Sequence, residues 1–104
     1  MDKIETAVEI FKALSDPTRL KLVKMLNDCE PGICKGGPLC VNALAQRLNI
    51  TQSAVSQHLR ILRQAGLVRG VREGAFMHYS LNADGLKKYK TALRETFGEN
   101  FVIS

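Results

Sequence analysis

The feature of this chain that most limits its possible folds is a three-residue turn, residues 49–51, between two short amphipathic segments. Apolar residues recur with the spacing of one helix face on both sides of this turn, at Val41, Leu44, Ala45 and Leu48 and again at Val55, Leu59 and Leu62. Thr51 is a good N-cap for the second segment, and Gly66 ends that segment soon after Gln64. Two short helices joined in this way predict a helix-turn-helix unit over residues 41–64.

Two further helices are predicted before this unit. The first covers "IETAVEIFKALS", whose apolar stripe consists of Ile4, Ala7, Val8, Ile10, Phe11 and Leu14. Ser15 or Asp16 caps the second helix, and Pro17 falls in its first turn, where a missing N–H costs nothing. The buried face of this second helix is expected to consist of Leu20, Leu22, Val23 and Leu26. The glycine- and proline-rich "NDCEPGICKGGP" then predicts a loop.

A β-hairpin and a last helix are predicted after the unit. The stretch "LVRGVREGAFMHYSL" indicates two strands around the turn "REGA", with Gly74 at a positive φ. Asn82 caps the last helix, one face of which is lined by Leu86, Tyr89, Leu93 and Phe97. This order predicts a mainly α fold with a small β-hairpin, a winged helix-turn-helix extended by helices at both ends. At 104 residues, the chain is expected to form one domain over residues 1–104.

The charge of the chain is concentrated in one window. The net charge is +5, and residues 43–72 contain five arginines with no Asp or Glu, so the remainder of the chain is balanced. An acid-free basic window is typical of a surface that binds a polyanion. No apolar run approaches the roughly 18 residues of a membrane span. The opening residues are too charged for a secretory signal, so we expect a cytoplasmic protein with no membrane partner.

Double-stranded DNA is the polyanion that the second helix of the unit is suited to bind. The side of this helix away from its apolar stripe carries Gln52, Ser53, Ser56, Gln57 and Arg60. Glutamine can pair with an adenine edge, arginine with guanine or phosphate, and serine with either base edges or phosphates. We expect His58 to pack at the edge of this surface or to contact a phosphate. Arg69 and Arg72, in the hairpin, are expected to reach an adjacent groove or the DNA backbone.

Two stretches resemble the ArsR/SmtB family of winged-helix repressors. They are "LSDPTRL" and "SQHLRILRQAGLV", and the similarity extends over nearly the whole chain. The resemblance implies a homodimer, built from the first and last helices, that binds a palindromic operator and blocks transcription. A twofold dimer presents its two recognition helices about 34–36 Å apart, one turn of DNA.

All three cysteines of the chain, Cys29, Cys34 and Cys40, lie within twelve residues. In arsenic-sensing members of the family, a Cys-Val-Cys at the start of the third helix binds the metalloid together with a further cysteine. Here Cys40 occupies the first of these positions, and Asn42 replaces the second cysteine. The expected inducer site therefore consists of the thiolates of Cys29, Cys34 and Cys40. Three sulfurs suit trivalent arsenic or antimony, whereas zinc prefers four ligands.

Other functions remain open at this point. The cysteines can instead form a redox switch, for example a disulfide between Cys34 and Cys40, or have no sensing role in a constitutive DNA-binding protein. DNA binding itself is expected to need no cofactor. The sequence contains no phosphate-binding glycine loop, nucleophile elbow or paired carboxylates typical of an enzyme, so we expect none of these catalytic chemistries.

Overall fold

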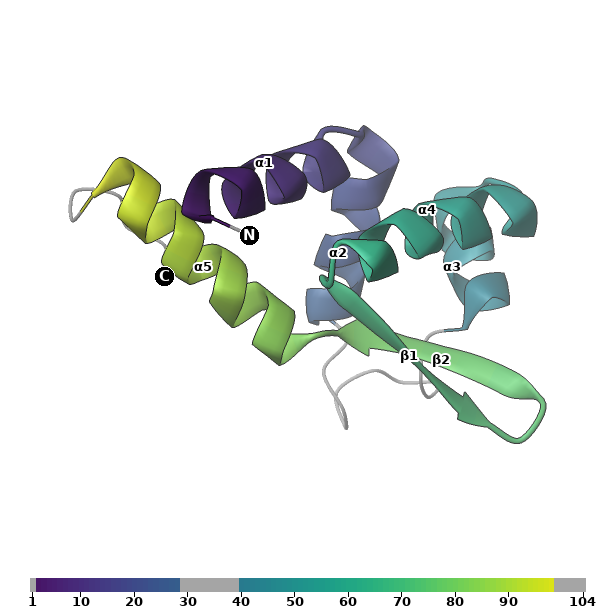
Figure 1. The fold of residues 1–104 in the computed structure, drawn as a ribbon. Helices are drawn as coiled ribbons and strands as arrows, with labels where there is room; N and C mark the ends of the chain where they lie inside the picture. The colour runs from purple at the N-terminus through teal and green to yellow at the C-terminus, as the bar shows by residue number, and fades with distance from the viewer. Residues whose placement is uncertain (1, 29–39, 99–104) are drawn as a thin grey trace.

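The computed structural model describes residues 2–28 and 40–98 and shows a winged helix-turn-helix fold (Figure 1). Its elements are α1 (Lys3–Leu14), α2 (Pro17–Asp28), α3 (Val41–Leu48), α4 (Gln52–Gln64), β1 (Val68–Glu73), β2 (Phe76–Leu81) and α5 (Ala83–Phe97). The predicted order of helices, turn and hairpin is confirmed. The loop predicted over residues 27–38 begins later than expected, because α2 continues through Asp28. The rest of the predicted loop lies outside the described residues.

The core lies where α2, α3, α4 and the start of β1 meet. Its largest fully buried side chains are Leu22, Leu44, Val55, Leu59, Leu62, Leu67 and Val68. Burial of each such side chain contributes about 1.5–3 kcal/mol relative to exposure. The apolar stripes predicted for α3 and α4 are therefore confirmed. They hold these two helices, which form the helix-turn-helix or reading unit, in a fixed relation.

The ends of the helices lie where local chemistry places them. The carboxylate of Asp16 accepts a hydrogen bond of 3.1 Å from the backbone N–H of Arg19, so Asp16 caps α2. The hydroxyl of Thr51 caps α4 in the same way through the N–H of Ala54. Asn49 adopts a left-handed conformation with φ 55°, which lets α3 end and the chain turn sharply into α4.

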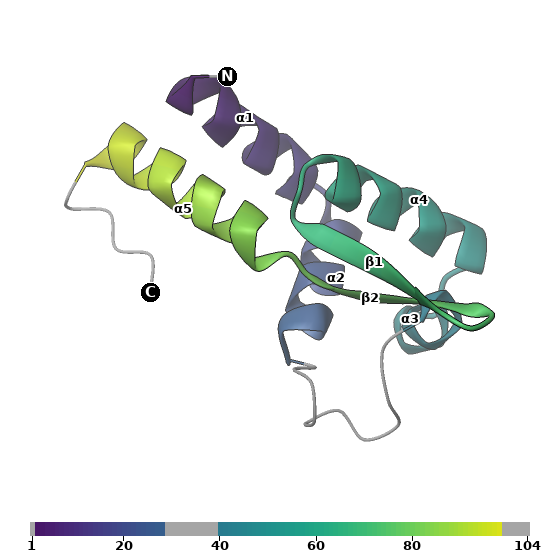
Figure 2. The ribbon, with the colours of Figure 1, turned by 60° about the horizontal axis from the view of Figure 1, so that its bottom comes forward.

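The wing is an antiparallel hairpin of β1 and β2, in which Val68 pairs with Leu81 and Glu73 with Phe76 (Figure 2). Gly74 has φ +62° at the turn, as predicted. A Cβ at Gly70 would lie 2.8 Å from Cε of Met77, the far end of a flexible side chain that can shift, and 3.2 Å from Cε1 of Tyr79. Gly70 therefore leaves room for these two side chains of β2.

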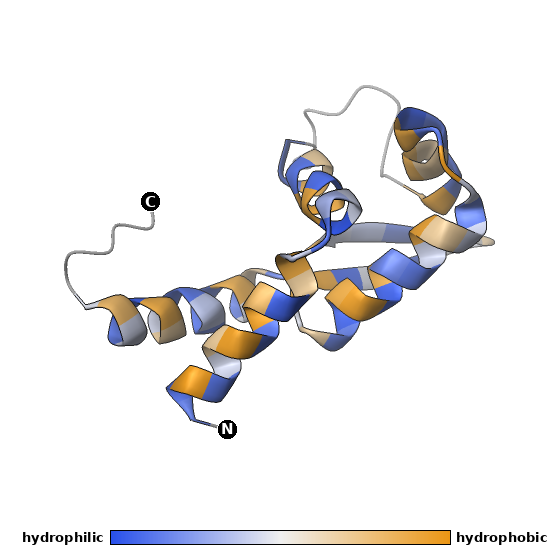
Figure 3. Ribbon diagram, turned by 90° about the horizontal axis from the view of Figure 1, so that it is seen from above, coloured by the Kyte–Doolittle hydropathy of each residue, from blue (hydrophilic) through white to orange (hydrophobic). Residues whose placement is uncertain are grey.

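The helices α1 and α5 pack against each other. On α1, the side chains of Ala7, Ile10 and Ala13 are buried. Ile4, Val8 and Phe11 of the predicted apolar stripe, and Phe97 of α5, are exposed. Leu20 was predicted on the buried face of α2, and this prediction is wrong because Leu20 is exposed. Figure 3, which looks onto α1, shows hydrophobic positions recurring along that helix.

Leu20 is exposed for a geometric reason. It precedes the fully buried Leu22 by two residues, and two residues correspond to about 200° around a helix. The two side chains therefore leave α2 on nearly opposite sides, and only the Leu22 and Leu26 side can face the core.

The start of α5 is tied to the end of α4. The backbone N–H of Asn82 donates to the carbonyl of Leu67 at 2.9 Å, and the hydroxyl of Tyr89 donates to the carbonyl of Ala65. Gly85 approaches the same turn so closely that a Cβ there would lie 1.7 Å from the carbonyl oxygen of Gly66. These contacts fix the direction in which α5 leaves the reading unit.

Candidate nucleic-acid interface

The outward face of α4 carries the predicted DNA-reading residues. The side chains of Gln52, Ser53, Ser56, Gln57 and Arg60 are all exposed. The opposite side of the helix is fully buried through Val55, Leu59 and Leu62. The core thus holds the helix from one side and leaves a polar surface with hydrogen-bond donors and acceptors on the other.

The electrostatics of α4 favour an anionic partner. Its first turn contains no acidic residue, and the unpaired N–H groups of a helix N-terminus carry a partial positive charge. Arg60 and Arg63 are exposed along the helix, and Arg47 is exposed on α3. This distribution agrees with the acid-free window of the sequence and suits contact with phosphate groups.

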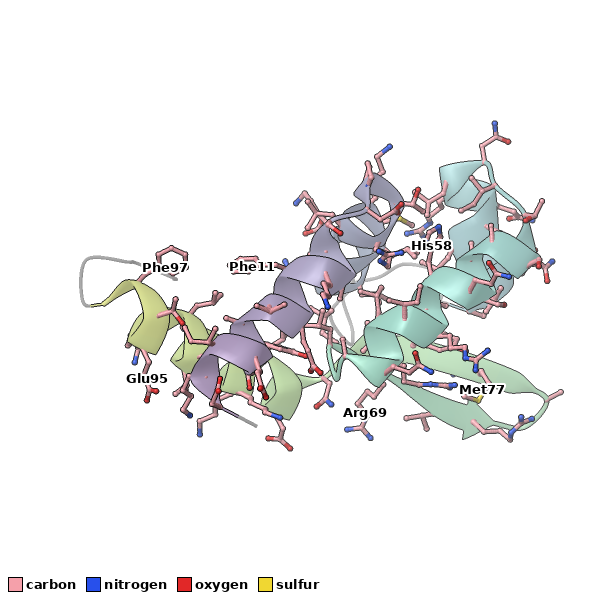
Figure 4. All side chains as sticks on the ribbon, turned by 45° about the horizontal axis from the view of Figure 1, so that its top comes forward. Phe11, His58, Arg69, Met77, Glu95 and Phe97 are labelled. Atoms are coloured by element: carbon pink, nitrogen blue, oxygen red, sulfur yellow. The ribbon has the colours of Figure 1, made fainter. Side chains whose placement is uncertain are left out.

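The two arginines expected in the wing are both exposed, but the strand separates them. Arg69 pairs with Ser80 and Arg72 with Met77, so Arg72 lies closer to the turn of the hairpin. Successive side chains of a strand point to opposite faces, and the two positions differ by three residues. Arg69 and Arg72 therefore do not form one patch, and Figure 4 shows Arg69 projecting from the base of the hairpin.

His58 is half-buried and turns toward the corner between α1 and α2 (Figure 4). Its Nδ1 lies 3.4 Å from Nη1 of Arg19 and 3.9 Å from the carboxylate of Asp16. Arg19 also donates from Nε to the carbonyl of Ala13 at 2.6 Å. The structure thus places His58 in the packing position that was one of the two roles expected for it.

The charge of Asp16 is part of this cluster. The pKa of its carboxyl is lowered, chiefly because the backbone N–H of Arg19 donates to it and also because His58 lies nearby. Desolvation opposes the shift without reversing it. From the sequence, Asp16 was predicted only as a candidate cap of α2, and Arg19 had no predicted role. Their presence within "LSDPTRL", one of the two stretches that carry the family resemblance, was the signal available.

A second contact, which was not predicted from the sequence, joins α3 to α4. The side-chain amide of Gln52 donates from Nε2 to Oδ1 of Asn42 at 3.2 Å. Gln52 is the first residue of α4, and Asn42 belongs to the first turn of α3. One of the predicted reading residues is therefore held by a neighbour that was noted only for replacing a cysteine.

Of the three cysteines, the structure describes Cys40 alone. Cys40 is the N-cap residue of α3, has a half-buried free thiol and makes no side-chain capping hydrogen bond. Cys29 and Cys34 lie outside the described residues. Within residues 2–28 and 40–98, no group of three His, Cys, Asp or Glu side chains is arranged to hold a metal ion.

An exposed polar helix on a buried apolar stripe, followed by a basic hairpin, defines a DNA-binding protein of the winged helix-turn-helix class. The model of the bacterial regulatory protein arsR family matches residues 16–69. The chain belongs to this family of DNA-binding transcriptional regulators. Among the residues that the structure describes, no helix is long and apolar enough to cross a membrane.

Individual relatives span most of the chain. The transcriptional repressor SdpR of Bacillus subtilis is 40% identical over 78 residues, which cover 75% of this chain and 78% of SdpR. The arsenical resistance operon repressor of Escherichia coli is 36% identical over 75 residues, 72% of this chain and 58% of that protein. The structure of reduced HlyU from Vibrio cholerae superimposes with a TM-score of 0.64 and 30% identity, covering 91% of this chain and 92% of HlyU.

Proposed function

We propose that this chain is a single-domain, homodimeric repressor that binds a palindromic operator and releases it when its cysteines bind a thiophilic inducer. The observation that carries DNA binding is the exposed polar face of α4, which a fully buried stripe holds outward. Relatives named as repressors support repression as the outcome of binding.

The α1–α5 pair supports the homodimer. Ile4, Val8 and Phe11 are 59%, 41% and 51% exposed on one side of α1, and Phe97 is 50% exposed on α5. Figure 4 shows Phe11 and Phe97 projecting from the same side of the two helices. Large apolar side chains gathered in this way are typical of a surface covered by a partner. A second copy of the chain would cover them and leave both α4 helices free.

In the proposed complex, α4 enters the major groove of each half-site. Gln52, Ser53, Ser56, Gln57 and Arg60 contact base edges and phosphates. Arg69 and Arg72 contact the backbone or an adjacent groove, and His58 supports α4 from behind. A twofold dimer reads two half-sites about 34–36 Å apart, so the operator is an inverted repeat.

The inducer that we favour is trivalent arsenic or antimony, bound by the thiolates of Cys29, Cys34 and Cys40. The position of Cys40 at the start of α3, in contact with the reading unit, supports this assignment. Membership in a family that includes an arsenical resistance repressor supports it as well. In the reducing cytoplasm that we expect for this protein, the thiols stay available to a soft ion.

Release of DNA requires that the inducer bind the DNA-free form more tightly than the DNA-bound form. Ligation of Cys40 would pull on the first turn of α3 and tilt the reading unit. A dimer that holds two recognition helices at a fixed separation is sensitive to such a tilt. The inducer and the operator therefore weaken each other's binding by the same factor.

Selection from a random duplex library, followed by footprinting on the enriched sequence, tests the DNA-binding part of the proposal. We expect an enriched inverted repeat protected at half-sites about 10–10.5 base pairs apart. Binding that is salt-sensitive but shows no sequence preference would instead identify a constitutive, architectural DNA-binding protein.

Titration of the operator complex with arsenite, and in parallel with a mild oxidant, tests the inducer. We expect release at near-stoichiometric arsenite and loss of this response in Cys34→Ser and Cys40→Ser. Release by oxidant alone, reversed by a reductant, would establish the redox alternative. The observation that supports this alternative is the likeness to HlyU, whose structure is that of the reduced protein. Operator affinity that neither reagent changes would reject both kinds of inducer.

A further inference from the structure

The contact between Asn42 and Gln52 connects the two helices of the reading unit at their N-termini. Nε2 of Gln52 lies 3.2 Å from Oδ1 of Asn42, although the residues are ten positions apart in the sequence. Both side chains are exposed, and Gln52 belongs to the face of α4 that contacts DNA in the proposed complex.

The two ends of this bond are anchored by the fold. α3 is held by the buried side chains of Leu44 and Ala45. At the start of α4, the hydroxyl of Thr51 accepts from the N–H of Ala54 at 3.1 Å. Because both backbones are fixed, the hydrogen bond selects one orientation of the Gln52 side chain from the many that an exposed glutamine can adopt.

The hydrogen bond to Asn42 leaves Gln52 with the groups that it needs to recognise adenine. The side-chain amide of glutamine carries two N–H donors and one carbonyl oxygen. Asn42 takes one N–H, so the other N–H and the oxygen stay available. A glutamine recognises adenine in the major groove with one donor to N7 and one acceptor for the N6 amino group. The bond to Asn42 is therefore compatible with bidentate adenine recognition and orders the amide beforehand.

We propose that Asn42 is a positioning residue that determines base specificity through Gln52 and favours adenine at the base pair that Gln52 contacts. This inference rests on the proposed function as a sequence-specific DNA-binding protein. It assigns a task to the residue that stands where arsenic-sensing relatives carry their second cysteine.

The test compares base preferences in a random duplex library selected by the wild-type protein and its variants. Gln52→Ala identifies the base pair in question, where we expect about five- to 150-fold discrimination to disappear. We expect Asn42→Ala to reduce discrimination severalfold at that same base pair. Asn42→Asp keeps an acceptor oxygen for Gln52, so this variant should still prefer adenine at that base pair. Its added negative charge should weaken DNA binding overall.

The matched control is Gln46→Ala, which removes another exposed amide one turn further along α3. It should leave the preference at the Gln52 base pair unchanged. The double variant Asn42→Ala/Gln52→Ala should discriminate no worse than Gln52→Ala alone, because Asn42 acts only through Gln52. Circular dichroism and thermal unfolding establish that each variant is folded.

Two results with Asn42→Ala would overturn the inference. One is that Asn42→Ala keeps the full base preference of the wild-type protein at the base pair that Gln52 contacts. The other is a changed preference at a different base pair, which would make Asn42 a direct DNA contact. If the wild-type protein itself enriches no sequence, the proposed function fails and this inference fails with it. Sequence enrichment that Asn42→Ala leaves intact overturns only the inference.

Discussion

Nη1 of Arg19 lies 3.4 Å from Nδ1 of His58, and this contact joins the corner between α1 and α2 to the recognition helix. Arg19 is itself held by its hydrogen bonds to the carbonyls of Ala13 and Lys12. The chain of contacts runs from the end of α1, the helix that carries the exposed apolar stripe, to the inner side of α4. The orientation of α4 therefore depends on residues far from DNA.

His58→Ala should lower the stability of the fold without changing the base preference of the protein. Loss of the contacts to Arg19 and Asp16 is expected to lower the free energy of unfolding by about 1 kcal/mol. DNA affinity should fall for all sequences alike. His58→Asn, which offers an amide oxygen near the position of Nδ1, is the matched control and should retain most of the stability. Altered preference at one base pair, with stability unchanged, would show that His58 contacts DNA directly.

The lowered pKa of Asp16 gives its contribution to stability a definite pH dependence. Because the folded state holds the proton less tightly than the unfolded state, the stabilisation is fully present above the ordinary pKa of 3.8. It is lost as pH falls through the lowered pKa of the folded state. Asp16→Asn keeps a capping side chain but removes the charge. Urea unfolding from neutral to acid pH should therefore show a shallower acid loss of stability in this variant than in wild type.

Phe11→Glu tests the apolar surface of the α1–α5 pair. Placing a charge in the apolar patch that a second copy covers in the proposed dimer is expected to weaken self-association by at least about 30-fold, the effect of losing a single strong interface residue. Sedimentation velocity measures the change, and operator affinity should fall with it. Gln46→Glu adds the same charge on α3 and should leave the oligomeric state as it is. Unaltered association of Phe11→Glu would place the dimer interface elsewhere.

The separation of Arg69 and Arg72 on the hairpin predicts unequal roles in DNA binding. Arg72, nearer the turn, is expected to contact a phosphate, so Arg72→Ala should reduce the slope of log affinity against log salt by about 0.9. Arg69→Ala should change the slope less. Lys24→Ala removes a cation that pairs with Asp28 on α2 and serves as the control. Equal slopes for wild type and Arg72→Ala would remove the wing tip from the interface.

Gly85→Ala should destabilise the protein, although replacing glycine by alanine within a helix usually stabilises it. Alanine normally stabilises a helix by about 0.5–1 kcal/mol relative to glycine. Here the added Cβ would collide with the carbonyl of Gly66, so we expect a loss of about 1–3 kcal/mol in chemical unfolding. Lys88→Ala, at an exposed position of α5, should be nearly neutral. A stabilised Gly85→Ala protein would mean that α5 and the turn after α4 separate easily.

Most of the fold could be predicted from the sequence because its signals are local. Thr51, Asn82 and Gly74 act within a few residues of their own positions, and the structure shows each in the predicted role. The stripes of α3 and α4 were equally informative, since both helices are short and one side of each faces the core. The predicted winged helix-turn-helix needed no information about distant contacts.

Periodicity could not show which apolar residues of α1 meet the rest of the chain. Ile4, Val8 and Phe11 have the regular spacing of a buried stripe, yet Ala7, Ile10 and Ala13 of the same helix are the residues that the fold buries. A stripe that is exposed in one chain and a stripe that is buried look the same in a sequence.

The contacts around the candidate site were beyond prediction for another reason. Arg19 meets His58, and Asn42 meets Gln52, only because of the angles at which the helices cross. These angles depend on the whole core. The sequence therefore predicted Gln52 on the DNA-reading face and His58 at its edge or on a phosphate, but not the neighbours that hold these two residues.

The contacts between the turn after α4 and the first half of α5 fix the angle between these two helices. Because Asn82, Tyr89 and Gly85 fasten α5 to the end of α4, the angle between the reading helix and the proposed pairing helix is built into each subunit. Two subunits joined through α1 and α5 would then hold their reading helices in one rotational phase. A single inserted base pair turns the second half-site by about 34–36° around the DNA axis. The proposed dimer would thus select the spacing between its two half-sites as well as their base sequence.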